Sequence, residues 1–339
     1  MALLPDLVAR WRLRAKTPAE KAVQWVRDHR VPGAGVKGRA SLPMASPEVT
    51  GYLIPSLYGL GERGLARELV QWEVSVQRPD GAIPAVDGVP YTFDTAQVVR
   101  GFLALLNELP ELEGPLRRAC DFIVSQIAPD GTILTPSLDM WQLSDGSVLS
   151  DYGHLYVLPP LLNAGRRLGV SRYMTAVEHA LDAFVRKPDL VVFKAELATL
   201  SHYFGYMMEA LADLGRTDLA REGLAQAAAL QRSDGAIPAY PGVDWVCAPG
   251  VAQLALTWYK LGERERADRA VAYLERVQNP SGGFFGSYGR GALYFPREEL
   301  GWAVKFFLDC VLLRNLAPAA GDAADHLDRR DAARGAPRD

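Results

Sequence analysis

The side chains of this 339-residue chain that could do acid–base chemistry include four carboxyls near the predicted starts of apolar helices. They are Glu48, Asp94, Asp151 and Glu299. Two carboxyls about 5–10 Å apart can hydrolyse a glycosidic bond, one as the acid and the other as base or nucleophile. An acid in a first helical turn also stabilises that helix end without any reaction. Both interpretations therefore stay open for Glu48, Asp94 and Asp151.

Histidine and tyrosine provide a second kind of chemistry, in which a base removes a proton beside a carboxylate. His154 follows Asp151 by three residues, so the acid could orient the imidazole as a base. A hydrogen-bonded histidine inside the fold has the same pattern. Tyr203 is another candidate base, and Arg290, in a glycine-rich segment, is a candidate clamp for a carboxylate or phosphate. Such a base and cation would serve elimination or epimerisation of a uronate.

Aromatic side chains accompany these acids, which is typical of sites that stack a sugar ring and bind its hydroxyls with carboxylates. The candidates for substrate binding are Tyr52, Tyr91, Tyr152, His202, Tyr203, Trp245, Tyr288, Arg290 and Trp302. Trp245 fits a pocket wall and a packing aromatic equally well. For His202 a structural role is the favoured interpretation.

A sequence repeat predicts the elements that position these residues. Each copy has a Leu-Gly pair and, sixteen residues after the glycine, a glutamine that opens a turn such as QRPDG or QRSDG. The glutamines are Gln77, Gln231 and Gln278. Glycine can cap a helix in the left-handed conformation, and sixteen residues make roughly four helical turns. The repeated acids of the turns are expected to form the turn itself, and they are Asp80, Asp130 and Asp234.

Apolar helices alternate with amphipathic ones along the chain. The apolar helices are expected near 47–60, 92–106, 151–168, 201–214, 248–261 and 296–313. Their polar-faced partners are expected near 18–30, 63–77, 113–127, 172–186, 217–231 and 264–278. Helices that are apolar on every side are buried, so this alternation predicts an all-α fold, an (α/α)6 toroid of six inner and six outer helices. A linear helical solenoid is the alternative.

The predicted domain is residues 17–316, with an N-terminal extension over 1–16 and a tail over 317–339 whose composition indicates disorder. Within the domain, connections into the inner helices are long and connections out of them are short. The long ones are 78–91, 128–149, 188–200, 232–247 and 279–295. They predict a functional face at the N-terminal ends of the inner helices, where free N–H groups also favour anions.

Composition excludes several classes of protein. The chain has 37 basic and 40 acidic side chains, for a net charge of −3, which argues against a nucleic-acid partner. Three cysteines make neither a disulfide framework nor a zinc site, and no apolar run is long enough for a membrane span. The N-terminus has no signal-peptide core. We therefore expect a cytoplasmic protein with a small-molecule or oligosaccharide substrate and no metal or other cofactor; the sequence does not indicate its oligomeric state.

The segments QRPDGAIP, QRSDGAIP and QNPSGGFFGSYG resemble the Gln/Gly/aromatic repeats of terpenoid cyclases and of the prenyltransferase β-subunit. The six-hairpin arrangement resembles glycan-active α/α toroids, namely glycosidases, polysaccharide lyases, sugar epimerases and glucuronyl C5-epimerases. The resemblance covers residues 17–316 and implies an architecture, because one fold carries many chemistries.

The motifs of the metal-dependent and cyclising members are missing. No Asp-x-Asp-Asp string occurs, and Asp244-Trp245-Val246-Cys247 lacks the spacing of the prenyltransferase zinc site. The resemblance then implies a carbohydrate-active enzyme that acts on a glycan or an acidic polysaccharide intermediate by hydrolysis, elimination or epimerisation. A terpenoid cyclase-like enzyme and a non-catalytic glycan-binding or scaffold toroid are the alternatives.

Overall fold

The computed structural model describes residues 16–135 and 150–316, and side chains are described from residue 153 in the second part. Asp151 and Tyr152 lie in a described helix, but their side chains are outside the described part, as are the extension 1–15 and the tail 317–339. No described helix is long and apolar enough to cross a membrane.

Six amphipathic helices form the outer layer, close to the predicted ranges. They are α2 (Pro18–Asp28), α4 (Arg63–Val76), α6 (Glu113–Ser125), α9 (Ser171–Val185), α11 (Thr217–Leu230) and α13 (Arg264–Val277). A capping box starts α2, in which Thr17 accepts a hydrogen bond from the Glu20 amide and the Glu20 carboxylate accepts one from the Thr17 amide. Each outer helix buries one side, as Leu65, Leu69 and Val70 do in α4.

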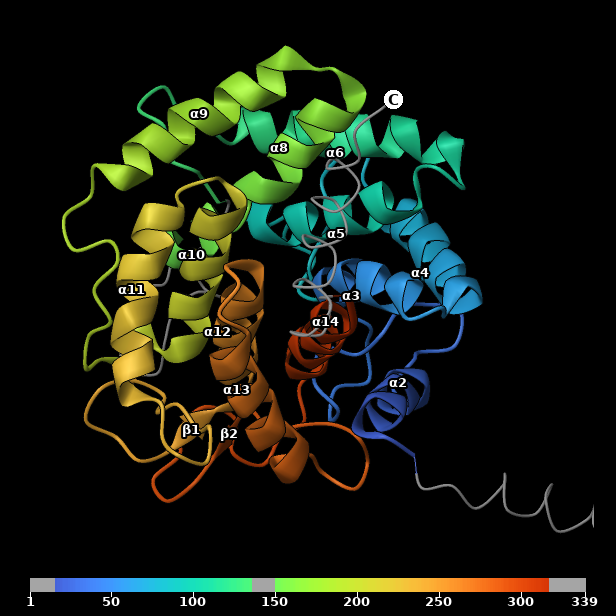
Figure 1. Cartoon of the computed structure of the whole chain (residues 1–339). Coiled ribbons are helices and arrows are strands. Elements are labelled where there is room, and N and C mark those ends of the chain that lie inside the picture. The colour runs from blue at the N-terminus through green and yellow to red at the C-terminus, as the bar shows by residue number, and fades with distance from the viewer. Residues whose placement is uncertain (1–15, 136–149, 317–339) are drawn as a thin grey trace, which may run out of the picture.

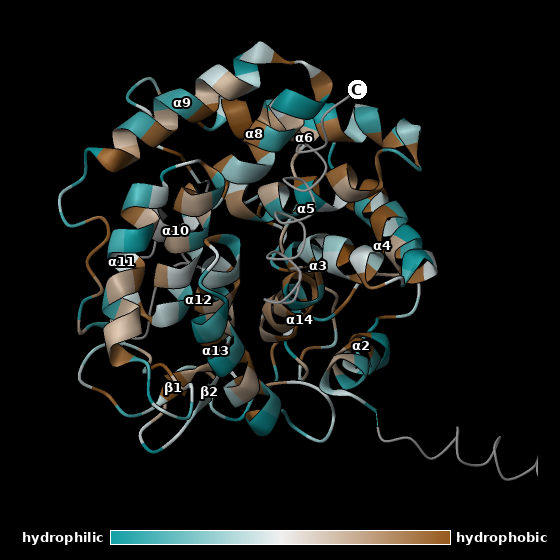
Figure 2. Cartoon of the chain, viewed as in Figure 1, coloured by the Kyte–Doolittle hydropathy of each residue, from teal (hydrophilic) through white to brown (hydrophobic). Residues whose placement is uncertain are grey.

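Apolar helices form the inner layer. They are α3 (Pro47–Gly59), α5 (Thr92–Leu105), α8 (Leu158–Leu168), α10 (Ser201–Asp213), α12 (Ala248–Lys260) and α14 (Gly301–Leu316). Short elements complete the description: α7 (Ser150–Leu155), the 3-10 turns η1 (Pro110–Leu112) and η3 (Leu197–Thr199), and strands β1 (Val246–Cys247) and β2 (Ser287–Tyr288), which pair antiparallel. In Figure 2 the inner helices α3, α5 and α14 are largely apolar, whereas the outer helices α9, α11 and α13 carry hydrophilic residues along their length.

The inner helices close into a ring (Figure 1). Each packs against the next along the chain, and α14 returns to pack against α3. The helices α3 and α5 pack closely: a Cβ at Gly51 would come 2.7 Å from Val98 Cα, and one at Gly101 would come 2.9 Å from the Gly51 carbonyl oxygen. The predicted toroid is confirmed, and the open solenoid is not what forms.

The glutamines of the repeated turns form hydrogen bonds to the start of the next outer helix. Gln77 donates from Nε2 to the Gly81 carbonyl at 3.1 Å and to the Pro115 carbonyl, at the start of α6, at 2.9 Å. Gln278 repeats this with Gly282 at 3.0 Å and Pro18 of α2 at 2.9 Å. The last turn thus binds the first outer helix, so the repeat itself closes the ring.

The turn acids are structural, as predicted. Each Oδ1 accepts a hydrogen bond from the amide two residues later, at 3.1 Å for Asp80, 2.9 Å for Asp130 and 3.0 Å for Asp234. The glycine after Asp80 has φ +91°, and a Cβ there would come 2.1 Å from the Arg118 carbonyl oxygen. The turn therefore requires glycine for its backbone conformation and for its close approach to α6.

Two inner helices differ from the prediction. The third is split into α7 and α8 because Pro159 and Pro160 cannot donate the backbone hydrogen bonds that would continue the first segment. The sixth begins at Gly301 rather than near 296, since Glu299 and Leu300 form β-bridges with Phe285 and Arg39. The second bridge ties the segment before α14 to the segment between α2 and α3.

Candidate functional site

Glu48 and Asp94 lie in the first turns of the adjacent inner helices α3 and α5. Ser46 caps α3, because its side chain accepts a hydrogen bond from the Val49 amide at 3.4 Å. Asp94 is 8 % exposed, and Glu48 is half-buried. The close packing of α3 on α5 brings these two predicted acids to the same end of the ring.

The environment of both carboxyls favours their neutral forms. Burial raises the pKa of Glu48 to about 7, although Tyr52 and Lys305 favour its charged form. Burial and the charge of Glu48 raise the pKa of Asp94 well above its usual range. Two coupled carboxyls that resist ionisation at neutral pH can retain a proton between them, which general acid catalysis requires.

Tyr52 and Lys305 lie next to this pair. Tyr52 follows Glu48 by one helical turn and is fully buried. The Lys305 ammonium group lies 2.8 Å from Asp309 Oδ2, donates to the Tyr156 hydroxyl at 3.3 Å and stands 3.7 Å from the centre of the Phe306 ring. Lys305 was not among the predicted site residues. Its position within a mostly apolar helix was a sequence signal that could have indicated a functional lysine.

An aromatic cluster is centred on His202 of α10, with Tyr203 and Tyr206 from the same helix and Tyr294 from the segment before α14. The His202 ring lies 4.6 Å from Tyr206, 5.3 Å from Tyr203 and 5.7 Å from Tyr294. Burial lowers the pKa of His202 to about 3, so its imidazole is neutral. His202 Nδ1 lies 2.5 Å from Gln253 Oε1, and since an amide oxygen accepts, Nδ1 carries the proton and Nε2 keeps its lone pair.

A third carboxyl, Glu73 of the outer helix α4, belongs to the same neighbourhood. It is fully buried, neither of its oxygens has a hydrogen-bond partner among the described residues, and burial and the Asp94 charge raise its pKa well above its usual range. Sequence analysis did not single out Glu73. Its spacing of four residues from Leu69 and eight from Leu65 placed it on the buried stripe of α4.

Several predicted site residues have structural partners instead. Glu299 accepts hydrogen bonds from Trp25 Nε1 at 2.6 Å, Asn279 Nδ2 at 2.7 Å and Ser281 Oγ at 2.5 Å. These bonds attach the last long loop to α2 and employ the Glu299 carboxylate fully. The structure thus brings Glu48 and Asp94 to the same end of the ring, whereas Glu299 holds the last long loop against α2.

The remaining aromatics divide between packing and loop contacts. Trp245 is 3 % exposed and meets Tyr240 edge-on at 5.5 Å, as a packing aromatic would. Tyr91 donates to Asp87 at 3.0 Å, and the Tyr288 hydroxyl accepts from the Phe285 amide at 3.0 Å.

Three further candidates complete the account of the predicted site. Trp302 packs edge-on against Phe295 at 6.0 Å. Arg290 is exposed, whereas His154 is buried at the end of α7. The edge-on contact gives Trp302 a packing partner, and the catalytic role predicted for His154 stays a prediction.

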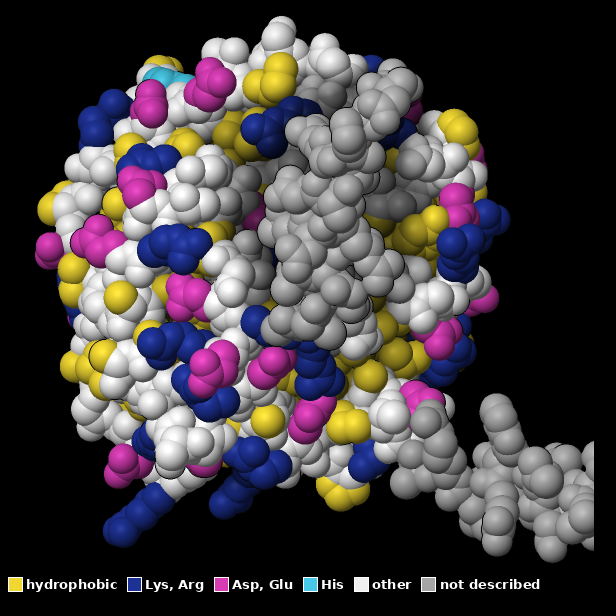
Figure 3. All heavy atoms as spheres, in the orientation of Figure 1, with side chains coloured by type: hydrophobic (Ala, Val, Ile, Leu, Met, Phe, Trp, Pro, Cys, Tyr) yellow, Lys and Arg dark blue, Asp and Glu magenta, His cyan; other side chains and the backbone are white. Residues whose placement is uncertain are grey.

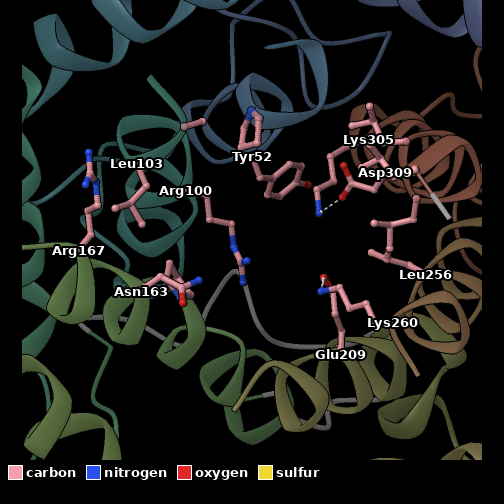
Figure 4. A pocket seen from close by; sticks show the side chains of 16 residues that line it. Tyr52, Arg100, Leu103, Asn163, Arg167, Glu209, Leu256, Lys260, Lys305 and Asp309 are labelled. Carbon is pink, nitrogen blue, oxygen red and sulfur yellow. Dashed lines mark hydrogen bonds and ion pairs between the residues drawn. The ribbon is translucent and has the colours of Figure 1, made fainter. Parts of the chain in front are cut away.

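A cavity of about 580 Å³ lies further along the same inner helices, towards their C-terminal ends. Tyr52 and Lys305, which both interact with Glu48, also line this cavity, and Arg100, Glu209 and Asp309 form more of its wall (Figure 4). Loop length pointed to the N-terminal ends of these helices. The cavity at the other end was not predicted.

Charge is mixed over the described surface. On the face in Figure 3, basic and acidic side chains alternate over α9, α11 and α13. Among residues 16–135 and 150–316, no group of three or more His, Cys, Asp and Glu side chains is arranged to hold a metal ion.

Comparisons with solved structures support the fold. An α-amylase from Clostridium perfringens has a TM-score of 0.66 at 10 % identity, over 90 % of this chain and 99 % of its own. An unsaturated glucuronyl hydrolase specific for heparin has a TM-score of 0.66 at 13 % identity, over 88 % and 95 %. A polysaccharide lyase has a TM-score of 0.56 at 14 % identity, over 89 % and 98 %.

The chain has the fold of an α/α toroid. Identities this low show the architecture alone. No protein-family model matches the sequence, and no curated protein matches it either.

Proposed function

We propose that this toroid is a carbohydrate-active enzyme that hydrolyses a glycosidic bond, with its site at the N-terminal ends of the inner helices. The observation that carries the proposal is the pair Glu48 and Asp94 in the first turns of adjacent helices, where the pKa values of both carboxyls are raised and the charge of Glu48 acts on Asp94. Hydrolysis of a glycosidic bond uses two carboxyls, one of which must hold a proton at working pH.

The environments of the two acids suggest their roles. Asp94 has its pKa raised by burial and by Glu48, so it keeps the proton and is the candidate general acid. Glu48 has a pKa of about 7 and is ionised in part at neutral pH, which suits a base or nucleophile. Tyr203, which is half-buried near the start of α10, is the candidate ring for stacking on a sugar.

The substrate is a glycan, and an acidic one is the favoured case. Lys305 contributes a cation beside Glu48. The similar solved structures include one described as specific for heparin and one described as a polysaccharide lyase. We place the reaction in the cytoplasm and expect it to need no metal; Asp151 and His154 stay as further catalytic candidates.

Elimination or epimerisation beside a carboxylate is a second candidate function. The observation that favours it is the packing of Tyr203, a candidate base, against the ring of His202. In this alternative Tyr203 or His154 would be the base, and the carboxyl pair would not be needed for turnover.

One assay separates these functions. The full-length protein is incubated with neutral and uronate-containing oligosaccharides, and new reducing ends and ultraviolet absorbance from unsaturated uronates are both measured. Hydrolysis gives reducing ends without absorbance, whereas elimination gives both. Asp94→Asn and Glu48→Gln should each lower hydrolysis by about 10²- to 10⁴-fold.

Glu113→Gln is the matched control, because Glu113 is an exposed acid on the outer helix α6. Hydrolysis that persists in both Asp94→Asn and Glu48→Gln would remove the pair from the mechanism. Binding of a glycan without turnover would instead favour the scaffold alternative, and a product from an isoprenoid diphosphate would favour the cyclase alternative.

A further inference from the structure

The cavity at the C-terminal ends of the inner helices shares Tyr52 and Lys305 with the surroundings of Glu48. Its volume of about 580 Å³ lies in the usual range for small-molecule sites. Neither Glu48 nor Asp94 lines it, and the elements that do are the middle and last turns of the inner helices. A ligand here would occupy a different place from a glycan bound at the long-loop end.

Arg100 is a cation of this cavity that makes no direct ion pair with a carboxylate of the described residues, although the charges of Glu209, Asp213 and Asp309 raise its pKa. Its Nε donates to Gln97 Oε1 at 3.0 Å and one Nη donates to the Tyr156 carbonyl at 3.2 Å. These neutral acceptors hold the guanidinium 4.1 Å from the centre of the Tyr156 ring, and Figure 4 shows it pointing into the cavity. Within the described part of the chain, no carboxylate is paired with it.

The lysines on the same wall differ from Arg100. Lys260 Nζ lies 2.9 Å from Glu209 Oε1 and 2.8 Å from Asp213, while Lys305 Nζ lies 2.8 Å from Asp309. Their charges are balanced within the protein. Arg100 therefore offers free N–H donors and a positive charge to whatever fills the cavity.

Glu209 supplies the complementary acceptor. It is 3 % exposed, and its Oε1 accepts from Lys260, but its Oε2 has no hydrogen-bond partner among the described residues. Figure 4 shows Glu209 pointing into the cavity from α10. A buried acceptor left without a donor costs about 1–3 kcal/mol or more, so a ligand that brings a donor here gains affinity.

Apart from Tyr52, Asn163 and Arg167, which donates to Asn107 Oδ1, the rest of the wall is apolar. Leucines come from three inner helices, with Leu103 on α5, Leu256 on α12 and Leu312 and Leu316 on α14, and Pro160 lies on α8. Leu316 is 74 % exposed and marks the rim. A polar centre with an aliphatic surround fits an amphipathic molecule.

We propose that this cavity binds a small amphipathic carboxylate that carries a hydrogen-bond donor on the neighbouring carbon. The carboxylate binds Arg100, the donor binds Glu209 Oε2, and the aliphatic chain lies along Leu103, Leu256 and Leu312. A hydroxyl and an ammonium group are both such donors, so hydroxy acids and amino acids are the two sources of this chemistry. Its polar centre, Arg100 and Glu209, differs from the proposed acid pair Glu48 and Asp94, although Tyr52 and Lys305 border both.

Calorimetric titration of the full-length protein tests the proposal. The probes are 2-hydroxyoctanoate, 2-aminooctanoate, octanoate and 1,2-octanediol. One of the first two should bind, and the probes without the donor or without the carboxylate should bind about 10- to 100-fold more weakly. The better of the two substituted acids identifies the source.

Two variants and a control complete the design. Arg100→Gln should weaken binding of the better acid by about 10- to 100-fold, and Leu256→Trp should abolish it by filling the cavity while leaving the charges in place. Arg172→Gln, which changes a surface arginine paired with Asp121, should bind as the parent does.

The proposal is overturned if no probe binds the full-length protein at millimolar concentration, or if binding is unchanged in Leu256→Trp. Should Arg100→Gln fail to fold, Leu256→Trp alone decides. Heat of binding is measured without any glycan, so this result is independent of the hydrolysis assay.

Discussion

The two ends of the inner helices hold carboxyls in opposite electrostatic states. At the N-terminal end, burial dominates and the pKa values of Glu48 and Asp94 are raised. Further along the ring, burial also opposes ionisation of Glu209, but Lys260, Lys305 and Arg100 outweigh it and lower its pKa. Glu209 is more buried than Glu48, so depth alone does not decide.

What differs is the number of cations within reach. Helix N-termini favour anions, and by that effect alone Glu48 and Asp94 should ionise readily. Their pKa values are raised nonetheless, because burial is the largest influence on both and the Lys305 cation beside Glu48 does not offset it. Acids that retain protons suit chemistry, whereas acids paired with lysines suit stability and binding.

The largest expected effect separates activity from stability at the N-terminal end. Asp94→Asn should reduce glycan hydrolysis by about 10²- to 10⁴-fold and leave unfolding by denaturant unchanged or slightly harder, because it replaces a desolvated acid with a neutral amide. Steady-state kinetics and urea unfolding check this. A variant that loses activity only in proportion to its folded fraction would contradict the proposed role.

At the cavity the same kind of change should act on folding. Lys260→Met leaves Glu209 and Asp213 without their ion-pair partner and should lower the free energy of unfolding by about 3 kcal/mol. Urea unfolding measures it, with Lys194→Met as the control for an exposed lysine paired with Asp189. If both variants lose the same stability, the contrast between the two ends is wrong.

The packing of α3 on α5 gives a smaller effect. A Cβ at Gly51 would come 2.7 Å from Val98 Cα, so Gly51→Ala should separate the helices that carry Glu48 and Asp94 and cost about 1–3 kcal/mol. Gly64→Ala in α4 meets no atom within 4 Å and should be neutral or stabilising. Thermal unfolding and the pH profile of activity are the measurements. An unshifted profile in Gly51→Ala would show that helix spacing does not control the coupling of the acids.

The pH dependence of stability gives the smallest effect, about 1 kcal/mol for one partly buried acid after solvent screening. Glu48 has a raised pKa in the folded state, so the folded protein holds a proton that the unfolded chain releases. Stability should therefore fall as pH rises from the usual glutamate pKa of 4.5 towards 7. Urea unfolding of Glu48→Gln across this range should show a flatter profile, and Glu113→Gln should follow the parent. A parent whose stability rises over this range would contradict the assigned shift.

Much of the fold could be predicted from the sequence. The repeat of Leu-Gly and Gln-turn segments placed the helices to within a few residues, because each signal acts on its own local backbone. Two exceptions have different causes. Pro159 and Pro160 separate α7 from α8, whereas α14 starts late because the two residues before it, Glu299 and Leu300, form β-bridges with other segments. The first exception is visible in sequence, but the second is not.

The site could be predicted only in part. Glu48 and Asp94 were identifiable as first-turn acids, and their position on adjacent inner helices followed from the ring. Glu299 matched the same pattern, yet Trp25, Asn279 and Ser281 bind its carboxylate. A local sequence pattern can predict that a residue lies at the start of a helix. It cannot predict hydrogen-bond partners that come from other segments of the chain.

By itself, the sequence determined the alternation of apolar and amphipathic helices, the turns that join them and the end of the ring where the long loops gather. These follow from periodicity and backbone preference, which act over a few residues. Only the tertiary structure decided which side of each inner helix faces the central axis. That rotation gives Arg100 a neutral hydrogen-bond partner, pairs Lys260 with Glu209 and places Glu48 near Asp94. These outcomes depend on tertiary structure because desolvation and charge pairing depend on neighbours that ring closure brings together.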